Sequence, residues 1–82
     1  MLEVKVSTWF LGKEKSRQVY NLESFDVEKY IGISLGMNKS YTSADIIEKG
    51  VDDEWFKVLF FNNNETKTLN NTLSMLIEVL DV

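Results

Sequence analysis

Polar and apolar residues alternate along the first 22 positions of the chain. Leu2, Val4 and Val6 alternate with polar residues, which is the period of two expected of a half-buried β-strand. A glycine and three charged residues at positions 12–15 then predict a turn, and alternation resumes over 16–22. We therefore predict an antiparallel hairpin formed by residues 2–11 and 16–22.

The pattern of residues 24–36 fits two structures. Ser24 is a candidate N-cap for a short helix over 25–31, with Phe25, Tyr30 and Ile31 on one side. Residues 31–36, however, alternate as a strand would. We expect a helical turn over 25–31 followed by an extended piece, and whether 25–36 is helix or strand stays open.

Two shorter segments carry clearer signals. Thr42 and Asp45 have the spacing of a capping box, and Gly50 stands where a left-handed residue ends a helix, which predicts a short middle helix over 43–49. Residues 55–61 are aromatic or aliphatic on both faces apart from Lys57, which predicts a central strand. The polar residues 62–65 predict a turn after it.

The last segment has helical periodicity. At 100° per residue from Leu69, five apolar residues fall within about 80° of the start; these are Leu73, Leu76, Ile77, Val79 and Leu80. A strand would place apolar residues on both faces instead. We predict an amphipathic helix over 68–81, with Met75 on the flank of its apolar arc.

Together these elements predict one α+β domain over residues 1–82. We expect a small antiparallel sheet of three to four strands, with the C-terminal amphipathic helix packed on one face and the short middle helix in a connection. A chain of 82 residues can build one modest core.

The amino-acid composition excludes several kinds of covalent cross-link, catalytic group and metal site. The chain has no cysteine and no histidine, which excludes disulfides, thiolate or imidazole catalysis, and zinc sites made from these residues. Nothing resembles a nucleophile beside its base, and residues 52–54 lack the spacing of an EF-hand, so we expect no enzyme, cofactor or metal. Lys57 alone among the titratable groups has a pattern suggesting burial, although such a lysine more often extends to the edge of a sheet.

Other features bear on location and origin. The N-terminal residues alternate as in a strand rather than forming a signal peptide, and apolar runs are too short to cross a membrane. We expect a cytoplasmic protein without membrane contact. Eight lysines to one arginine, seven asparagines and no proline suggest a phage or low-G+C bacterial genome.

Charge is unevenly distributed along the chain. Residues 1–41 hold six bases and five acids, whereas residues 42–82 hold three bases and eight acids. One acidic segment is a candidate surface for a basic partner, or for imitating the phosphates of a nucleic acid; it consists of Asp45, Glu48, Asp52, Asp53 and Glu54. The alternative is that these acids favour a helix N-terminus and a solvated loop.

Two further sets of residues are candidates for binding. Trp9 and Met75 have no assigned place in the core and could anchor an interface, or a second layer could bury them. The turn of the predicted hairpin carries three bases near aromatic residues, a combination that can hold single-stranded nucleic acid; the bases are Lys13, Lys15 and Arg17. The acidic balance of the chain and the use of lysine to protect strand edges argue against this last interpretation.

We therefore expect a small acidic protein-binding module, an inhibitor or regulator that occupies a surface of a partner protein, and we expect that partner to have a basic surface. The alternative hypothesis is a structural protein that assembles as a homo-oligomer through a strand edge or the Trp9 face. Nucleic-acid binding through residues 13–17 is a third hypothesis.

Overall fold

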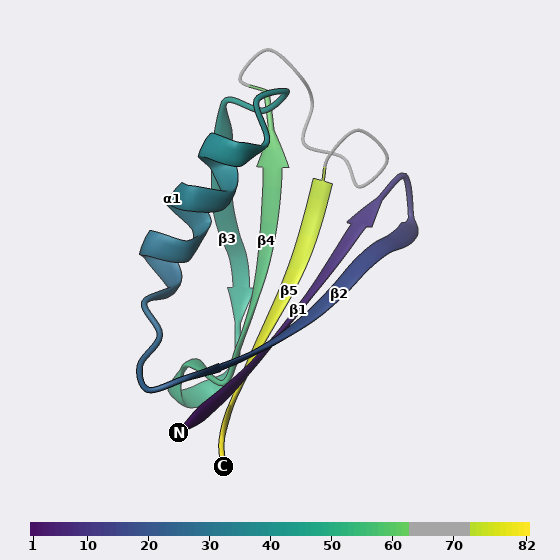
Figure 1. Cartoon of the computed structure of the whole chain (residues 1–82). Helices are drawn as coiled ribbons and strands as arrows, with labels where there is room; N and C mark the ends of the chain where they lie inside the picture. The colour runs from purple at the N-terminus through teal and green to yellow at the C-terminus, as the bar shows by residue number, and fades with distance from the viewer. Residues whose placement is uncertain (63–72) are drawn as a thin grey trace.

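The computed structural model describes residues 1–62 and 73–82, which form a five-stranded antiparallel sheet and one α-helix (Figure 1). The strand order is β2-β1-β5-β4-β3, so β1, β5 and β4 are internal and β2 and β3 are the edges. In chain order, the elements are β1 (Leu2–Phe10), β2 (Lys13–Leu22), α1 (Val27–Met37), β3 (Ser43–Lys49), the 3₁₀ turn η1 (Val51–Asp53), β4 (Trp55–Phe61) and β5 (Leu73–Asp81).

The predicted N-terminal hairpin is present, with a tighter turn than expected. β1 and β2 pair from Leu2 opposite Leu22 to Phe10 opposite Lys13. Leu11 and Gly12 form the turn at φ values of 54° and 74°, a left-handed conformation that suits glycine. The register shifts between Thr8 and Trp9, which makes the end of the hairpin irregular.

Helix α1 is longer than the helical turn expected over 25–31. Its N-cap is Asp26, whose carboxylate accepts a hydrogen bond from the Lys29 amide, so Ser24 is not the cap. The helix runs on to Met37, and the expectation of an extended piece after residue 31 is therefore wrong. Ile31 and Ser34, three residues apart, are both buried, which is the spacing of a helix packed on a sheet.

The prediction of a middle helix over 43–49 is wrong, because these residues form strand β3. Thr42 uses its amide to bond the Phe61 carbonyl at 3.1 Å, so it continues the ladder with β4 instead of capping a helix. Ala44 lies opposite Phe60 and Ile46 opposite Val58, and both pack against the core. Burial of these side chains against β4 outweighs the local capping signal.

The main correction concerns the C-terminus, where the expected helix over 68–81 is absent. Residues 68–72 lie outside the described part, and Leu73–Asp81 form β5, which pairs with β1 on one side and β4 on the other. Leu73, Met75 and Ile77 lie on the buried face of β5, whereas Leu76 and Leu80 lie on its opposite face, so the strand carries apolar residues on both faces. The apparent helical arc came from combining these two faces.

Strand β4 confirms the prediction for residues 55–61, and it is internal, between β3 and β5. Of the turn expected over 62–65, only Asn62 lies in the described part. The expected sheet of three to four strands is thus a five-stranded sheet, because β3 and β5 replace two predicted helices.

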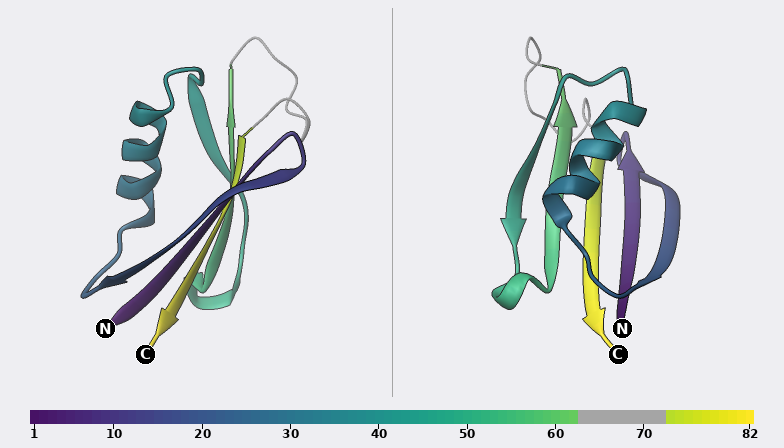
Figure 2. Two further views of the ribbon diagram at one scale, coloured as in Figure 1. Left: turned by 45° about the vertical axis from the view of Figure 1, so that its right-hand side comes forward. Right: turned by 60° about the vertical axis from the view of Figure 1, so that its left-hand side comes forward.

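The molecule has two layers, with α1 lying against one face of the sheet (Figure 2). The core lies between them and draws on β1, β4, β5 and α1; its buried members are Val4, Val6, Ile31, Phe56, Val58, Phe60, Leu73, Met75 and Ile77. The chain ends lie side by side, since the Val82 amide donates to the Met1 carbonyl at 3.1 Å. Within the described residues, no helix is long and apolar enough to cross a membrane.

Candidate protein-binding face

None of the described elements covers the sheet face opposite α1 (Figure 2). We call this surface the open face. Side chains alternate along each strand, so it carries the residues that do not point towards α1. Residues on this face include Lys5, Ser7 and Trp9 from β1, Arg17 and Val19 from β2, Asp45 and Ile47 from β3, Trp55, Lys57 and Leu59 from β4, and Ser74, Leu76 and Glu78 from β5.

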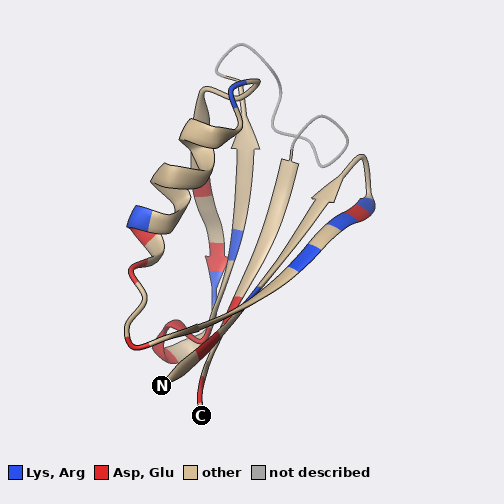
Figure 3. Ribbon diagram, viewed as in Figure 1, with Lys and Arg blue, Asp and Glu red and all other residues tan. Residues whose placement is uncertain are grey.

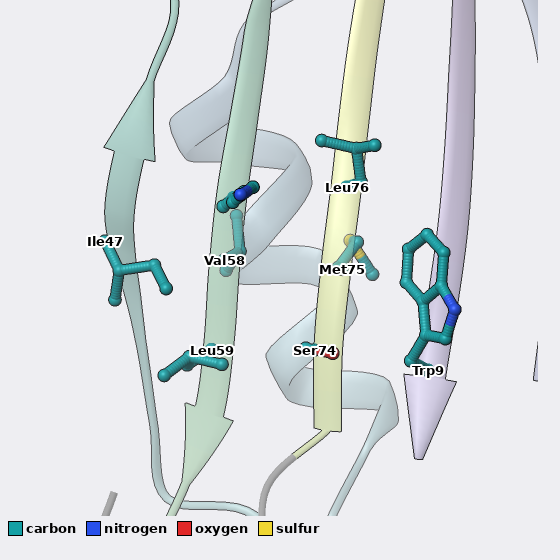
Figure 4. Close-up of a pocket in the computed structure, with 8 residues that line it drawn as sticks. Trp9, Ile47, Val58, Leu59, Ser74, Met75 and Leu76 are labelled. Carbon is teal, nitrogen blue, oxygen red and sulfur yellow. The ribbon is translucent and has the colours of Figure 1, made fainter. Parts of the chain in front are cut away.

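The centre of the open face is apolar and hollowed. A depression of about 220 Å³ lies beside Trp9 and extends across β5 and β4 to Ile47 (Figure 4). Leu76 and Leu59 lie between these two side chains, and Leu59 is buried. Trp9 is half-buried and Ile47 is 51% exposed, so both offer apolar surface to a partner.

Cationic side chains on and beside the open face are paired with acids. Three ion pairs are present: Lys5 with Glu3 at 3.7 Å, Arg17 with Glu14 at 3.0 Å, and Lys57 with Glu48 at 3.7 Å. Each pair is largely solvent-exposed, and such pairs contribute little to stability. Their effect is to neutralise the positive charge around the apolar centre. Lys57 is exposed and not buried in the sheet.

Acidic residues gather at the end of the sheet where the two termini lie (Figure 3). We call this set the acidic end. The topology brings together the start of β1, the end of β2, the β3–β4 turn and the end of β5. The set consists of Glu3, Glu23, Asp26, Asp52, Asp53, Glu54, Glu78 and Asp81.

The acidic segment predicted from sequence is divided between two places. Asp45 and Glu48 lie on β3, opposite Leu59 and Lys57, whereas residues 52–54 belong to the acidic end. Asp52 and Asp53 also have a structural role, because both adopt left-handed backbone conformations that aspartate tolerates better than most residues. The acids contributed by β1, β2 and β5 were not predicted, since only the strand order brings them to one end.

The basic residues of the predicted nucleic-acid site do not share a face. Arg17 lies on the open face, where Glu14 holds its guanidinium, whereas Lys15 borders the space between the sheet and α1. Lys13 is at the start of β2, opposite Phe10. This arrangement does not form a continuous groove for a phosphate backbone.

The two predicted apolar anchors have different surroundings. Trp9 lies on the face opposite Val4 and Val6, as the alternation along β1 predicts, and borders the hollow. Met75 is 6% exposed and belongs to the core, so it offers little surface to a partner. Leu76, Leu59 and Ile47 were missed. Treating 73–81 as a strand would have placed Leu76 on the opposite face from Met75.

A second hollow, on the helix side, lies between α1 and the hairpin, with a volume of about 670 Å³. Tyr20 and Tyr30 meet here edge to face, and the Tyr20 hydroxyl donates a hydrogen bond to Gln18. Burial, together with a hydrogen bond to Tyr20, raises the pKa of Tyr30 from 10.0 to about 12. Tyr30 is thus neutral over the physiological range and acts as a packing group.

Within residues 1–62 and 73–82, no three carboxylates come together in a way that could hold a metal ion. The arrangement of the open face therefore offers surface complementarity: an apolar hollow, neutralised cations around it, and excess negative charge at one end. Comparison with known proteins finds no matching family model, no matching curated protein and no matching solved structure.

Proposed function

We propose that this protein is a small binding module that inhibits or regulates another protein by occupying part of its surface. The open face is the contact surface in this proposal, and the partner is a cytoplasmic protein with a basic surface. The observation that carries it is the apolar hollow beside Trp9 on a sheet face that no described element covers.

The size of the hollow favours a protein partner over a small ligand. Pockets that hold drug-sized molecules typically measure roughly 300–1,000 Å³ and enclose most of the ligand. The hollow beside Trp9 measures about 220 Å³ and opens on a sheet surface. It suits one apolar side chain projecting from a larger surface, with Trp9 and Leu76 as the contacting groups. Buried tryptophans at the centre of an interface often carry much of the binding energy.

The charge distribution favours a basic partner. The chain has a formal net charge of −4, and the cations nearest the hollow are already paired with acids. Asp52, Glu54, Glu78 and Asp81 form no salt bridge with another described residue. A field of this kind accelerates association with a positively charged surface and weakens as salt screens it.

Affinity capture from nuclease-treated host lysate tests the proposal when wild type and variants are compared. Trp9→Ala removes the apolar anchor, and Met37→Ala is its control, because Met37 is a 78% exposed residue on α1. We expect one protein in near-stoichiometric amount with wild type and Met37→Ala. Its affinity for Trp9→Ala should fall roughly 30-fold or more, the loss expected at an interface hot spot.

A second variant tests the charge component without disturbing the β3–β4 turn. Asp52→Asn, Asp53→Asn and Glu54→Gln together remove three charges, and asparagine keeps the tolerance for a left-handed backbone. We expect slower association and a weaker dependence on salt concentration, with unchanged circular dichroism. A partner that binds both this variant and Trp9→Ala as tightly as wild type would refute the proposed contact surface.

A further inference from the structure

Strand β2 is an edge that could accept another strand. Its ten residues, Lys13–Leu22, pair with β1 on one side, and no described strand pairs with the other side. All but Tyr20 and Leu22 are exposed, including Val19 at 53%. A long exposed edge presents unpaired amide and carbonyl groups, and proteins usually protect such an edge with lysine, proline, a bulge or a covering element.

Protection of this edge is confined to one half of the strand. Lys13, Lys15 and Arg17 lie in the N-terminal half, near the irregularity opposite Thr8 and Trp9. Residues 18–22 carry no charge and no proline, and Glu23 follows directly. β2 is therefore basic at its start, neutral along its second half and acidic just beyond its end.

When two copies of β2 run antiparallel, the basic start of each strand lies opposite the acidic residue that follows the other strand. If Gln18 lies opposite Gln18 of a second copy, then Lys13 lies opposite Glu23 and Lys15 opposite Asn21 of that copy. Arg17 then lies opposite Val19, so no two bases face each other. A register centred in the basic half would place lysine against lysine or arginine, which is unfavourable across a strand pair.

The other edge of the sheet is less suited to pairing. β3 has seven residues and a register shift between Ile46 and Glu48. Self-pairing of β3 would bring Asp45 and Glu48 close to the same acids of the second copy. Pairing β3 with β2 of a second copy leaves an edge free at each end, so it would continue into open-ended assemblies.

We propose that two copies of the chain form a symmetric dimer by antiparallel pairing of β2 with β2 along its length, about a two-fold axis at Gln18. The axis is perpendicular to the sheet, so the sheets join into a single one with both helices on the same side. The two open faces also lie on one side. The interface consists mainly of backbone hydrogen bonds and a few side chains, so the dimer is weak and forms at high protein concentration.

Cysteine cross-linking measures the register directly, because the wild-type chain contains no cysteine. Directly opposed residues of antiparallel strands have Cα atoms roughly 4.5–5.5 Å apart, a distance that a disulfide can span. Single cysteines are introduced at positions 16–20 of β2, with Glu48→Cys on β3 as the control. Under mild oxidation we expect disulfide dimers to form most at Gln18→Cys, to decrease on both sides of it, and to be absent for Glu48→Cys.

Charge exchange provides a second measurement that depends on no disulfide. Sedimentation equilibrium should show a dimer that Glu23→Lys weakens at least several-fold, and that Lys13→Glu in the same chain restores. Glu54→Lys, at the acidic end but remote from β2, should leave the dimer unchanged, because Glu54 is exposed and has an ordinary right-handed backbone. A monomer at all concentrations, or disulfide dimers that form no more at Gln18→Cys than at Glu48→Cys, would overturn the proposal.

Discussion

Two glycines weaken the helix that covers the sheet, and replacing both with alanine should stabilise the protein. Gly32 and Gly36 lie within α1 and are exposed, and a Cβ added at either position would meet no heavy atom within 4 Å. Alanine is more favourable than glycine in a helix by about 0.8–1.0 kcal/mol per residue, because the unfolded chain has less freedom to lose. The double variant should therefore gain roughly 1.6–2 kcal/mol.

Urea denaturation followed by circular dichroism measures this gain. For a domain of this size, each kcal/mol raises Tm by about 4–8 °C, so the double variant should melt roughly 6–16 °C higher. Gly12→Ala is the control of opposite sign: its φ of +74° is unfavourable for alanine, and we expect a loss of about 1 kcal/mol. If Gly12→Ala destabilised as expected while the double variant gained nothing, the exposed helical conformation of residues 32–36 would be refuted.

Three other changes follow from the packing of the core and helix. Phe60→Ala should cost about 3–5 kcal/mol in urea denaturation, since Phe60 is fully buried, and a cost below about 1 kcal/mol would contradict its position. Asp26→Ala should cost about 1 kcal/mol through loss of the N-cap, whereas an equal loss for Ser24→Ala would place the cap at Ser24 instead. Because the pKa of Tyr30 is raised to about 12, the stability contributed by its neutral hydroxyl is complete below pH 10 and is lost as pH rises through about 12. Tyr30→Phe should lose less stability than wild type over this pH range, and identical pH profiles would show that Tyr30 ionises equally in the folded and unfolded chains.

The N-terminal hairpin and β4 could be predicted because their signals are local. Alternation along β1 and β2 and the turn at Gly12 specify neighbouring strands without reference to the rest of the chain. β4 has a run of aromatic and β-branched residues that suits few other structures.

The C-terminal strand could not be predicted in the same way. Leu73–Asp81 carries apolar residues on both faces, and its place in the sheet is set by pairing with β1 and β4, strands that the sequence alone does not identify as its neighbours. Without knowledge of them, a helix that collects the apolar residues on one side is the simpler interpretation. The prediction of a helix at β3 was wrong for a related reason, since pairing with β4 overrides the capping signal at Thr42.

The candidate site shows the same division between local and long-range information. Alternation along β1 correctly separated Trp9 from Val4 and Val6, which is a local inference. The neighbours of Trp9 in the hollow come from β5, β4 and β3, so identifying Leu76 and Ile47 required the strand order. Likewise, the acidic end exists only because strands from both halves of the chain begin or finish at one place.

Because Met1 and Val82 are in contact, the backbone could be closed at this point and opened at another without changing the order of the strands in the sheet. A short linker could join these residues, and new ends could be opened at the exposed turn formed by Leu11 and Gly12. Such a circular permutant would keep every strand pairing, with its ends at the opposite end of the sheet. For the same reason, the chain can be inserted into a loop of another protein, which it would enter and leave at nearly a single point.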